Sequence, residues 1–505
     1  MIKKPVPRGS YIPAALARYC LNGDAYVPVE DSYRICCGEK PRTPYPVFQT
    51  DLAEQLRLGN VAREGTRLYL TRTLRYEEST AGHLAGILAA NDVEPPVIPD
   101  KLTVGELTLF PEQRKAVQFA LSHRLSVILG GAGSGKTTLI RAIAAQCGNE
   151  AYRVICAPTG KAARNLTERT GCVARTIHSA LGMQPDDDFL SPVIWENVGL
   201  VVVDEASMMS LEMLAGILCK MRKDCRVVLL GDPNQLLSVG AGNVLPDLFR
   251  LKVPYIRLEA NHRQEGSAVG LLRNVVGFSG LRGVNDLVFD DSFEFLEMGE
   301  SAVREALVEE AVRRYLMGEK VQVLSPYNRV TELSVVKLNA AIQRRVNPPE
   351  EGKRELRYGG KIFREGDWVI ITKNDRERNC SNGDVGVFHI LKPGEDVLGH
   401  CVELPDGRCP VWESEEGLEN LSLAYALTVH KVQGSEADTI LMPITDSFSN
   451  MLYRNLLYTA ISRGRKKVIL YGSRNALSVA LQRPARERQS QLVAKTHMAM
   501  LRRAV

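Results

Sequence analysis

The sequence has no run that approaches the ~20 consecutive apolar residues of a membrane span, so we expect no membrane-spanning segment. Its first residues, 1–13, are basic but lead into no apolar stretch, which excludes a secretory signal. The eleven cysteines contain no CxxC pair, although structural zinc sites usually hold closely spaced cysteines. These absences favour reduced thiols and a cytoplasmic protein.

Internal repeats and low-complexity tracts are also absent from the 505 residues. Apolar residues make up 45% and charged residues 24% of the chain, the balance of a globular protein. Its length predicts roughly three to four structural units rather than one core. A net charge of +5 is compatible with a phosphate-backbone partner, although many metabolic enzymes are equally basic.

Short apolar runs alternate with helical patterns from about residue 105 onward. Continuous β-branched runs separated by helices indicate parallel sheets covered on both faces. A first group of runs is followed, from about residue 319, by a second. The first comprises 125–129, 153–157, 200–203 and 226–230, with a helix over 137–146, and the second comprises 320–324 and 467–471.

Two other regions have a different texture. Residues 1–100 mix proline-rich pieces with a helical run over 76–90, and consecutive prolines at 95–99 indicate a linker. Between about 346 and 420, glycine, aspartate and charged residues become frequent, with short strands expected at 367–371 and 386–390. This second region is predicted to be a small inserted β-barrel.

A glycine-rich turn between an apolar strand and a helix fits the pattern G-x(4)-G-K-[ST]. Backbone N–H groups of such a turn wrap the β-phosphate, and the helix N-terminus adds positive potential. Lys136 would neutralise phosphate charge, and Thr137 would supply a hydroxyl to Mg²⁺. The alternative, a flexible turn with a chance lysine, does not explain the flanking elements. The expected nucleotide ligands are Gly130, Gly131, Ala132, Gly133, Ser134, Gly135, Lys136, Thr137 and Thr138.

An acidic pair supplies what a P-loop needs next. The apolar strand 200–203 carries Asp204 to its end, where the carboxylate would hold Mg²⁺, and Glu205 would orient or deprotonate the attacking water. Adjacent acids are usually a solvated surface pair, but a pair at the end of a buried strand is not. These elements predict hydrolysis of a nucleoside triphosphate without saying what the hydrolysis drives.

Nine motifs, read in order, resemble those of superfamily 1 helicases, and within them the RecD-like branch of subfamily 1B. The resemblance extends from about residue 105 to 475. Besides the P-loop, the motifs are 110–113 (FPEQ), 157–163 (APTGKAA), 176–178 (TIH), 204–208 (DEASM), 231–236 (GDPNQL), 261–264 (NHRQ), 425–436 (YALTVHKVQGSE) and 458–465 (YTAISRGR).

The resemblance implies an α/β fold with two RecA-like P-loop parallel-sheet domains, an inserted small SH3-like β-barrel and a short N-terminal domain. The expected boundaries are 1–100 for the N-terminal accessory or docking domain, 101–265 for the first motor domain, 266–345 with 421–505 for the second, and 346–420 for the insertion. Residues 181–196 stand where the family has a strand-separating hairpin, here short and acidic at its tip.

Site roles also follow from the resemblance. Gln113 resembles the residue that reads the adenine edge, and Gln235 resembles the γ-phosphate sensor. Arg263 and Arg463 resemble the two arginines that reach the γ-phosphate, Arg463 from the second motor domain. Gly434 and Glu436 resemble the loop that meets the nucleotide sugar and phosphates. One position departs from the family, because His262 stands where an aromatic residue often stacks on adenine.

The nucleic-acid track is expected to grip a single strand through its backbone, since a motor cannot depend on sequence. The alternative for each residue is packing of the loops at the strand ends. The residues that match the family's contacts are Pro158, Thr159, Lys161, His178, Thr428, His430 and Lys431.

The leading hypothesis is therefore a DNA helicase or translocase that uses ATP and Mg²⁺, moves 5′→3′ on single-stranded DNA and meets duplex junctions, likened to motors of recombination and repair. The polarity and the choice of DNA come from the resemblance alone. The alternative is a RecD-like motor subunit of a larger helicase–nuclease or defence complex, docked onto a RecBC-like partner through the N-terminal region. The second group of motifs, at 425–465, disfavours a small-molecule kinase.

Overall fold

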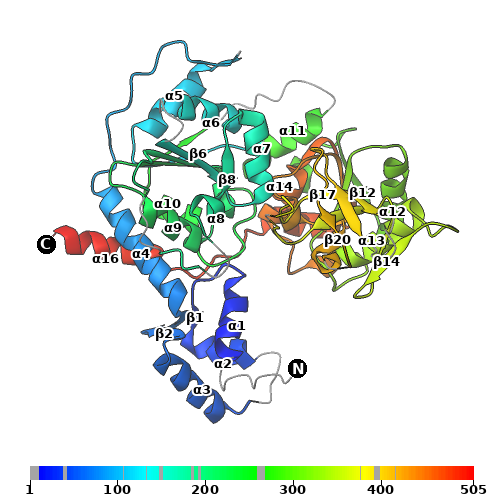
Figure 1. Ribbon diagram of the computed structural model, residues 1–505, viewed down its shortest axis with the longest axis horizontal. Helices are drawn as coiled ribbons and strands as arrows, with labels where there is room; N and C mark the ends of the chain where they lie inside the picture. Colours follow the sequence, from blue (N-terminus) through cyan, green and yellow to red (C-terminus); the bar gives the residue numbers. More distant parts are fainter. Residues whose placement is uncertain are drawn as a thin grey trace.

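The computed structural model describes residues 11–37, 43–105, 107–131, 133–146, 152–183, 187–190, 195–258, 268–375, 377–391, 399–415 and 417–504. Figure 1 shows an N-terminal unit, two α/β units side by side and a small β-domain at the edge of the second. The fold class expected from the sequence is confirmed.

The first motor domain is built on a six-stranded, wholly parallel sheet of order β11-β6-β10-β9-β7-β8. The central strands β6, β9 and β10 are apolar and almost wholly buried, because helices cover both faces. Its strands are β6 (Leu125–Leu129), β7 (Arg153–Ala157), β8 (Ala174–Thr176), β9 (Leu200–Val203), β10 (Arg226–Gly231) and β11 (Tyr255–Arg257), preceded by the hairpin β4 (Thr103–Val104) and β5 (Leu107–Thr108). Its helices are α5 (Pro111–Leu121), α6 (Lys136–Ala145), α7 (Gly160–Thr170), α8 (Ile177–Ala180), α9 (Leu211–Lys220) and α10 (Val244–Arg250).

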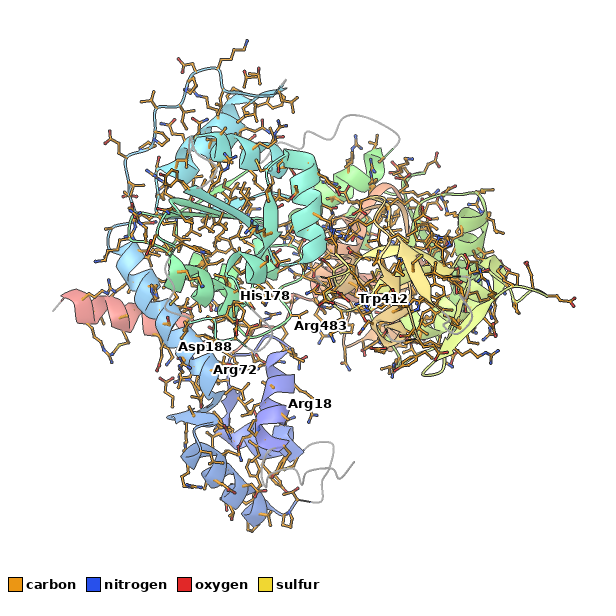
Figure 2. All side chains as sticks on the ribbon, in the orientation of Figure 1. Arg18, Arg72, His178, Asp188, Trp412 and Arg483 are labelled. Carbon is orange, nitrogen blue, oxygen red and sulfur yellow. The ribbon has the colours of Figure 1, made fainter. Side chains whose placement is uncertain are left out.

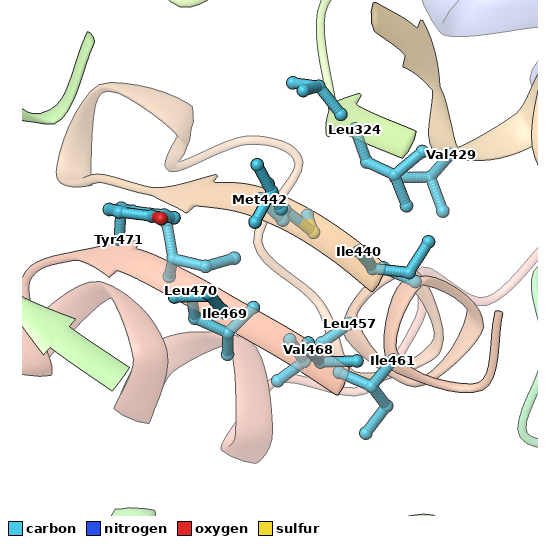
Figure 3. Packing of buried hydrophobic residues seen from close by; sticks show 14 of the residues in the cluster. Leu324, Val429, Ile440, Met442, Leu457, Ile461, Val468, Ile469, Leu470 and Tyr471 are labelled. Atoms are coloured by element: carbon cyan, nitrogen blue, oxygen red, sulfur yellow. The ribbon is translucent and has the colours of Figure 1, made fainter. Parts of the chain in front are cut away.

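The second motor domain has a five-stranded parallel sheet of order β12-β23-β22-β13-β21. Figure 3 shows Val468 of β23 beside Leu457 and Ile461 of α14, with Ile440 of β22 nearby, within one buried cluster. Each such side chain contributes about 1.5–3 kcal/mol on burial. The elements are α11 (Val269–Gly277), β12 (Phe293–Glu297), α12 (Glu300–Leu316), β13 (Val321–Ser325), α13 (Val335–Val346), β21 (Ala426–Thr428), β22 (Ala437–Ile444), α14 (Arg454–Ile461), β23 (Gly464–Gly472) and α15 (Arg474–Gln482).

The inserted β-domain lies between α13 and β21 and is antiparallel, with strand order β19-β18-β17-β16-β20 plus the hairpin β14–β15. Its last strand, β20, pairs with β16 and lies just beyond residue 420, where the sequence suggested the insertion ends. The strands are β14 (Glu355–Tyr358), β15 (Lys361–Arg364), β16 (Trp368–Ile371), β17 (Val385–Ile390), β18 (His400–Glu403), β19 (Val411–Trp412) and β20 (Leu421–Leu423).

The N-terminal region falls into two parts that the sequence did not separate. Residues 11–70 have a core of their own, whereas α4 buries Tyr76, Leu84 and Ile87 in the core of the first motor domain. The helix also starts five residues before the expected run over 76–90. The elements are α1 (Tyr11–Cys20), β1 (Val27–Pro28), α2 (Val29–Cys37), α3 (Tyr45–Arg57), β2 (Val61–Glu64), β3 (Arg67–Leu70) and α4 (Thr71–Leu88).

The C-terminal segment returns from the second motor domain to the first. After α15 the chain crosses so that α16 (Leu492–Ala504) packs on α4, on the far side of the molecule from α12 and β12 (Figure 1). Along the crossing, Arg488 donates to Ser238 Oγ at 3.0 Å and Gly242 O at 2.9 Å, and Arg486 donates to Asp24 at 2.6 Å. This segment therefore ties the N-terminal unit and both motor domains together.

Candidate nucleotide site and nucleic-acid track

The P-loop follows β6 and opens α6, at the carboxyl edge of the first sheet. Gly133 and Gly135 have φ angles of 82° and 81°, which favour glycine. The ammonium group of Lys136 donates to the carbonyl oxygens of Gly130 at 2.5 Å and Gly131 at 2.9 Å. Lys136 is thus held over the turn where a phosphate would bind. Ala132 lies outside the described residues.

Asp204 and Glu205 stand at the end of β9, which is separated from the P-loop strand β6 by β10 in the same parallel sheet. Burial, and then the charge of Glu205, raise the pKa of the Asp204 carboxyl, while Lys136 opposes that rise. Glu205 has a φ of 51°, unusual for a residue with a side chain and typical of functional sites. A carboxylate here and the Thr137 hydroxyl at the start of α6 form a hard-oxygen donor set suited to Mg²⁺, which retains water and takes phosphate oxygens.

Gln235 joins the two motor domains at this edge. With its amide nitrogen toward Glu205, it donates to Oε2 at 3.3 Å, and its amide oxygen accepts from Arg463 Nη2 at 3.3 Å. Arg463 follows α14 of the second domain and is only 5% exposed. Its Nε is buried without a hydrogen-bond partner among the described residues. Gln235 and Arg463, two of the residues expected to act on the γ-phosphate, therefore meet, and the Arg463 Nε donor is not used by the described residues.

The other expected nucleotide ligands are placed less directly. Gln113 is buried at the start of α5, where its Oε1 accepts from the Phe110 N–H at 3.2 Å. The Gly434 carbonyl accepts from Asn165, and Glu436 accepts from Arg169 at 3.3 Å, so both contact α7 of the first domain. Ser134 and Thr138 lie in the P-loop and α6. His262 and Arg263 lie outside the described residues.

The expected nucleic-acid contacts near α7 differ in exposure. Pro158 is buried, and Thr159 caps α7 by accepting from the Ala162 N–H at 3.2 Å. Lys161 is half-buried, and burial lowers the pKa of its ammonium group to about 8, against the opposing charge of Asp384. It lines a cavity of about 820 Å³ between α7, the second motor domain and the β-domain. The helix-capping role of Thr159 and the burial of Pro158 are therefore compatible with packing of this loop as well as with contact to a nucleic-acid strand.

The remaining expected contacts lie on both domains. His178 is exposed on α8, its ring 5.3 Å from that of Phe189. Figure 2 shows it near the junction of the N-terminal unit with the motor domains. Thr428 and His430 are half-buried, and burial, followed by the charge of Arg488, lowers the His430 pKa. Lys431 is exposed.

Sequence reasoning missed basic and acidic residues around this track. Arg164 of α7 pairs with Asp384 of the β-domain, and a Cβ on Gly160 would lie 2.7 Å from that of Ser381. The β-domain therefore covers the turn that begins α7. These residues are far apart in the sequence and meet only because the two domains pack together, so no local sequence pattern could have revealed them.

The segment likened to a strand-separating hairpin, 181–196, lies only partly within the described residues. Its described residues, 181–183, 187–190 and 195–196, contain no strand. Phe189 is buried against Tyr76, with ring centroids 5.9 Å apart, and Asp188 pairs with Arg75 at 2.9 Å. The described part of the acidic tip is thus bound to α4 rather than projecting freely.

Two parallel-sheet domains with a P-loop on one and a converging arginine from the other define a P-loop nucleoside triphosphatase of the RecA-like, two-domain class. Comparison with known families is specific. Residues 108–274 match a model described as an AAA domain, 338–398 the SH3 domain of ATP-dependent RecD-like DNA helicases, and 423–471 a UvrD-like helicase C-terminal domain.

Curated relatives agree with these matches. The chain is 33% identical to an ATP-dependent RecD2 DNA helicase of Deinococcus radiodurans, covering 93% of this chain but only 63% of that protein. It is 31% identical to the RecD subunit of the RecBCD enzyme of Mycolicibacterium smegmatis, covering 83% of this chain and 81% of that subunit. A solved structure of Pif1 helicases at forked double-stranded DNA has 20% identity and a TM-score of 0.47, covering 75% of this chain and 95% of that one.

The chain belongs to the RecD-like family of ATP-driven DNA helicases. Among the helices in the described ranges, none is both long and apolar enough to cross a membrane.

Proposed function

We propose that this protein is an ATP-driven motor that moves 5′→3′ along single-stranded DNA and opens duplexes at junctions, in recombination or repair. The observation that carries the proposal is the Gln235 bridge between Glu205 of the first motor domain and Arg463 of the second. Closing such a cleft around a γ-phosphate couples hydrolysis to domain motion, as a translocating motor requires.

The roles proposed for single residues rest on the family resemblance and, for the described residues, on the geometry of the site. Lys136, Thr137 and Asp204 hold the phosphates and Mg²⁺, Glu205 activates water, and Gln235, Arg463 and Arg263 act on the γ-phosphate. Gln113 and His262 meet the base, and Gly434 and Glu436 meet the sugar and phosphates. The single strand runs over Thr159, Lys161, His178, Thr428, His430 and Lys431, with Pro158 shaping the turn. Magnesium dependence and a cytoplasmic location belong to the same proposal.

The test is unwinding of two matched duplexes, one with a 5′ single-stranded tail and one with a 3′ tail, with ATP and Mg²⁺. The proposal expects only the 5′-tailed duplex to open. Opening of only the 3′-tailed duplex would overturn the polarity. No ATPase response to single strands and no opening of either duplex would overturn the motor function itself.

A second candidate is a motor subunit that needs a partner. The RecD protein of M. smegmatis is named as a subunit of RecBCD, and residues 11–70 here form a unit with its own core and exposed apolar side chains such as Leu21, Tyr45 and Leu58. Single-strand-stimulated ATPase without unwinding of either duplex would favour this candidate, and co-purification of a large partner with the native protein would support it.

A further inference from the structure

The segment that carries Gln235, residues 232–236 of the first motor domain, is held by side chains of the second. The Tyr458 hydroxyl donates to Asp232 Oδ2 at 2.6 Å. The Asn455 amide donates to the carbonyl oxygens of Pro233 at 3.2 Å and Gln235 at 2.9 Å. These two carbonyls follow β10 and are outside the sheet, so the amide supplies the donor that the sheet does not.

Leu236, the residue after Gln235, is held by the second motor domain at both its N–H and its carbonyl. The Leu236 N–H donates to Thr459 Oγ1 at 2.8 Å, and the Leu236 carbonyl accepts from Gln433 Nε2 at 3.1 Å. Thr459 is completely buried and Gln433 is 4% exposed. Buried hydrogen bonds of this kind fix position closely, because breaking one leaves a buried polar group without a partner.

The helix α14 carries the two residues that hold the 232–236 segment and leads directly to Arg463. Asn455 and Thr459 are one turn apart on α14, so they share a face, and Arg463 follows the end of the helix at Ile461. Arg463 in turn contacts the side chain of Gln235. The main chain of the 232–236 segment is therefore anchored to the element that delivers Arg463, on either side of Gln235.

We propose that Asn455 and Thr459 are positioning residues that lock residues 232–236 to α14, so that Gln235 and Arg463 reach the γ-phosphate as one preassembled unit. This inference rests on the proposed function. Neither residue touches the nucleotide. They act by setting where Gln235 lies relative to Arg463, and a misplacement of about 1 Å at such a site can cost a factor on the order of 10² in rate.

The first test is a matched pair of substitutions at the buried position. Thr459→Val keeps the volume and removes the acceptor for the Leu236 N–H, whereas Thr459→Ser keeps the hydroxyl and removes a methyl group. We expect Thr459→Val to lower the DNA-stimulated kcat on the order of 10-fold or more with KM for ATP changed less than about threefold. Thr459→Ser should restore most of the rate. Equal losses in both variants would mean a packing role and would overturn the proposal.

A second test uses the half-buried Asn455, where a substitution is less able to impair folding than at the buried Thr459. Asn455→Ala removes the amide donor to Pro233 and Gln235 at a helix surface, so the melting temperature should stay close to that of the wild type. We expect the same kcat loss with KM retained. Combined with Arg463→Ala, it should cost less than about twofold more, because a positioning residue has nothing left to position. Additive losses in this double-mutant cycle would overturn the proposal.

The wild-type measurements separate the two levels of inference. If the wild-type protein shows no single-strand-stimulated ATPase and opens neither duplex, the proposed function fails before the positioning role is tested. If Arg463→Ala leaves kcat unchanged, the role of Arg463, on which the positioning role rests, is wrong. If both behave as expected while Asn455→Ala and Thr459→Val keep full kcat, only the positioning role is wrong.

Discussion

The guanidinium group of Arg164, on α7 of the first motor domain, donates two hydrogen bonds to the carboxylate of Asp384 in the β-domain, one of them at 2.9 Å. Such two-pronged pairs fix orientation as well as distance. Asp384 is 5% exposed and also accepts from the Ser381 N–H at 2.9 Å. Since Ser381 lies against Gly160, the pair holds the β-domain over the turn that contains Thr159 and Lys161.

Asp384→Asn should therefore increase the affinity for single-stranded DNA in the absence of nucleotide. The substitution removes a negative charge beside Lys161 and weakens the contact that covers the turn. Removing about 1 kcal/mol of repulsion corresponds to an increase of roughly fivefold. Fluorescence anisotropy with a labelled oligothymidine at low salt and about pH 6, where Lys161 stays charged without the Asp384 carboxylate, would measure it.

The control for this prediction is Asp375→Asn in the same domain. Asp375 pairs with Arg378 at 2.7 Å, so its ion pair lies within the β-domain. The Asp375→Asn substitution should leave the affinity for single-stranded DNA unchanged. An unchanged or weaker affinity for Asp384→Asn would show that this pair does not compete with the strand.

Lys161 predicts a pH dependence of DNA binding. Burial lowers its pKa to about 8, the charge of Asp384 opposes this, and the charges of Lys320 and Arg164 add to it. Below that pH the ammonium group is charged and attracts phosphate; above it the charge is lost. Affinity should therefore fall as the pH rises from about 7 to about 9 at constant ionic strength.

Lys161→Arg provides the matching control, because a guanidinium stays charged throughout this range. Its affinity should be flat with pH where that of the wild type falls. Identical slopes for both proteins would assign the pH dependence to another group.

Local sequence patterns predicted the strands and turns that place the nucleotide site at one edge of the first sheet. The strands Leu125–Leu129 and Leu200–Val203 were predictable because fully buried parallel strands are continuous apolar runs. The P-loop and the acidic pair then followed from the turns after them. Pairings between distant residues carry no such signal. Arg164 meets Asp384, and Asn455 meets Gln235, only because two domains pack together.

The N-terminal region shows a second limit. The helix α4 looked like part of a separate unit. Its apolar positions indicate that one face is buried, but they do not indicate which domain that face packs against. The C-terminal segment, which returns to cover that helix, has the same ambiguity.

Glu77 on α4 tests that packing. It is completely buried, accepts from the Gln491 N–H at 2.8 Å and from Tyr69 Oη at 3.1 Å, and so joins the C-terminal segment to the N-terminal unit. Glu77→Ala leaves these donors unpaired and should lower the free energy of unfolding by about 3 kcal/mol. The adjacent Glu78 is 56% exposed and lies 3.9 Å from Lys495, so Glu78→Ala should change it by less than about 0.5 kcal/mol. Chemical denaturation of both variants would measure the difference, and equal stabilities would contradict the packing role.

Lys136→Ala should abolish ATP hydrolysis with the fold intact. Within the described residues the Lys136 ammonium group donates to two P-loop carbonyl oxygens, at 2.5 and 2.9 Å, so removing it costs the fold little. Phosphate charge would then lack its nearest cation. A steady-state phosphate-release assay with circular dichroism checks both halves, and a variant that retained full ATPase would contradict the P-loop assignment.

Arg463→Ala should lower kcat by on the order of 10³ while nucleotide binding is largely retained, because an arginine that arrives from the second domain stabilises charge that develops in the transition state. Its buried Nε has no hydrogen-bond partner in the described part of the chain, and its Nη2 lies 3.3 Å from the Gln235 amide oxygen, so the guanidinium is placed to take up a further anionic oxygen. Single-turnover hydrolysis and equilibrium binding of a fluorescent ATP analogue would separate the two effects. Lys466→Ala is the control. Lys466 is exposed, and its ammonium group pairs with Asp438 at 2.7 Å rather than with Gln235. If both variants kept the wild-type kcat, the second motor domain would contribute no arginine to hydrolysis, and coupling between the ATPase and domain closure would have to run through another residue.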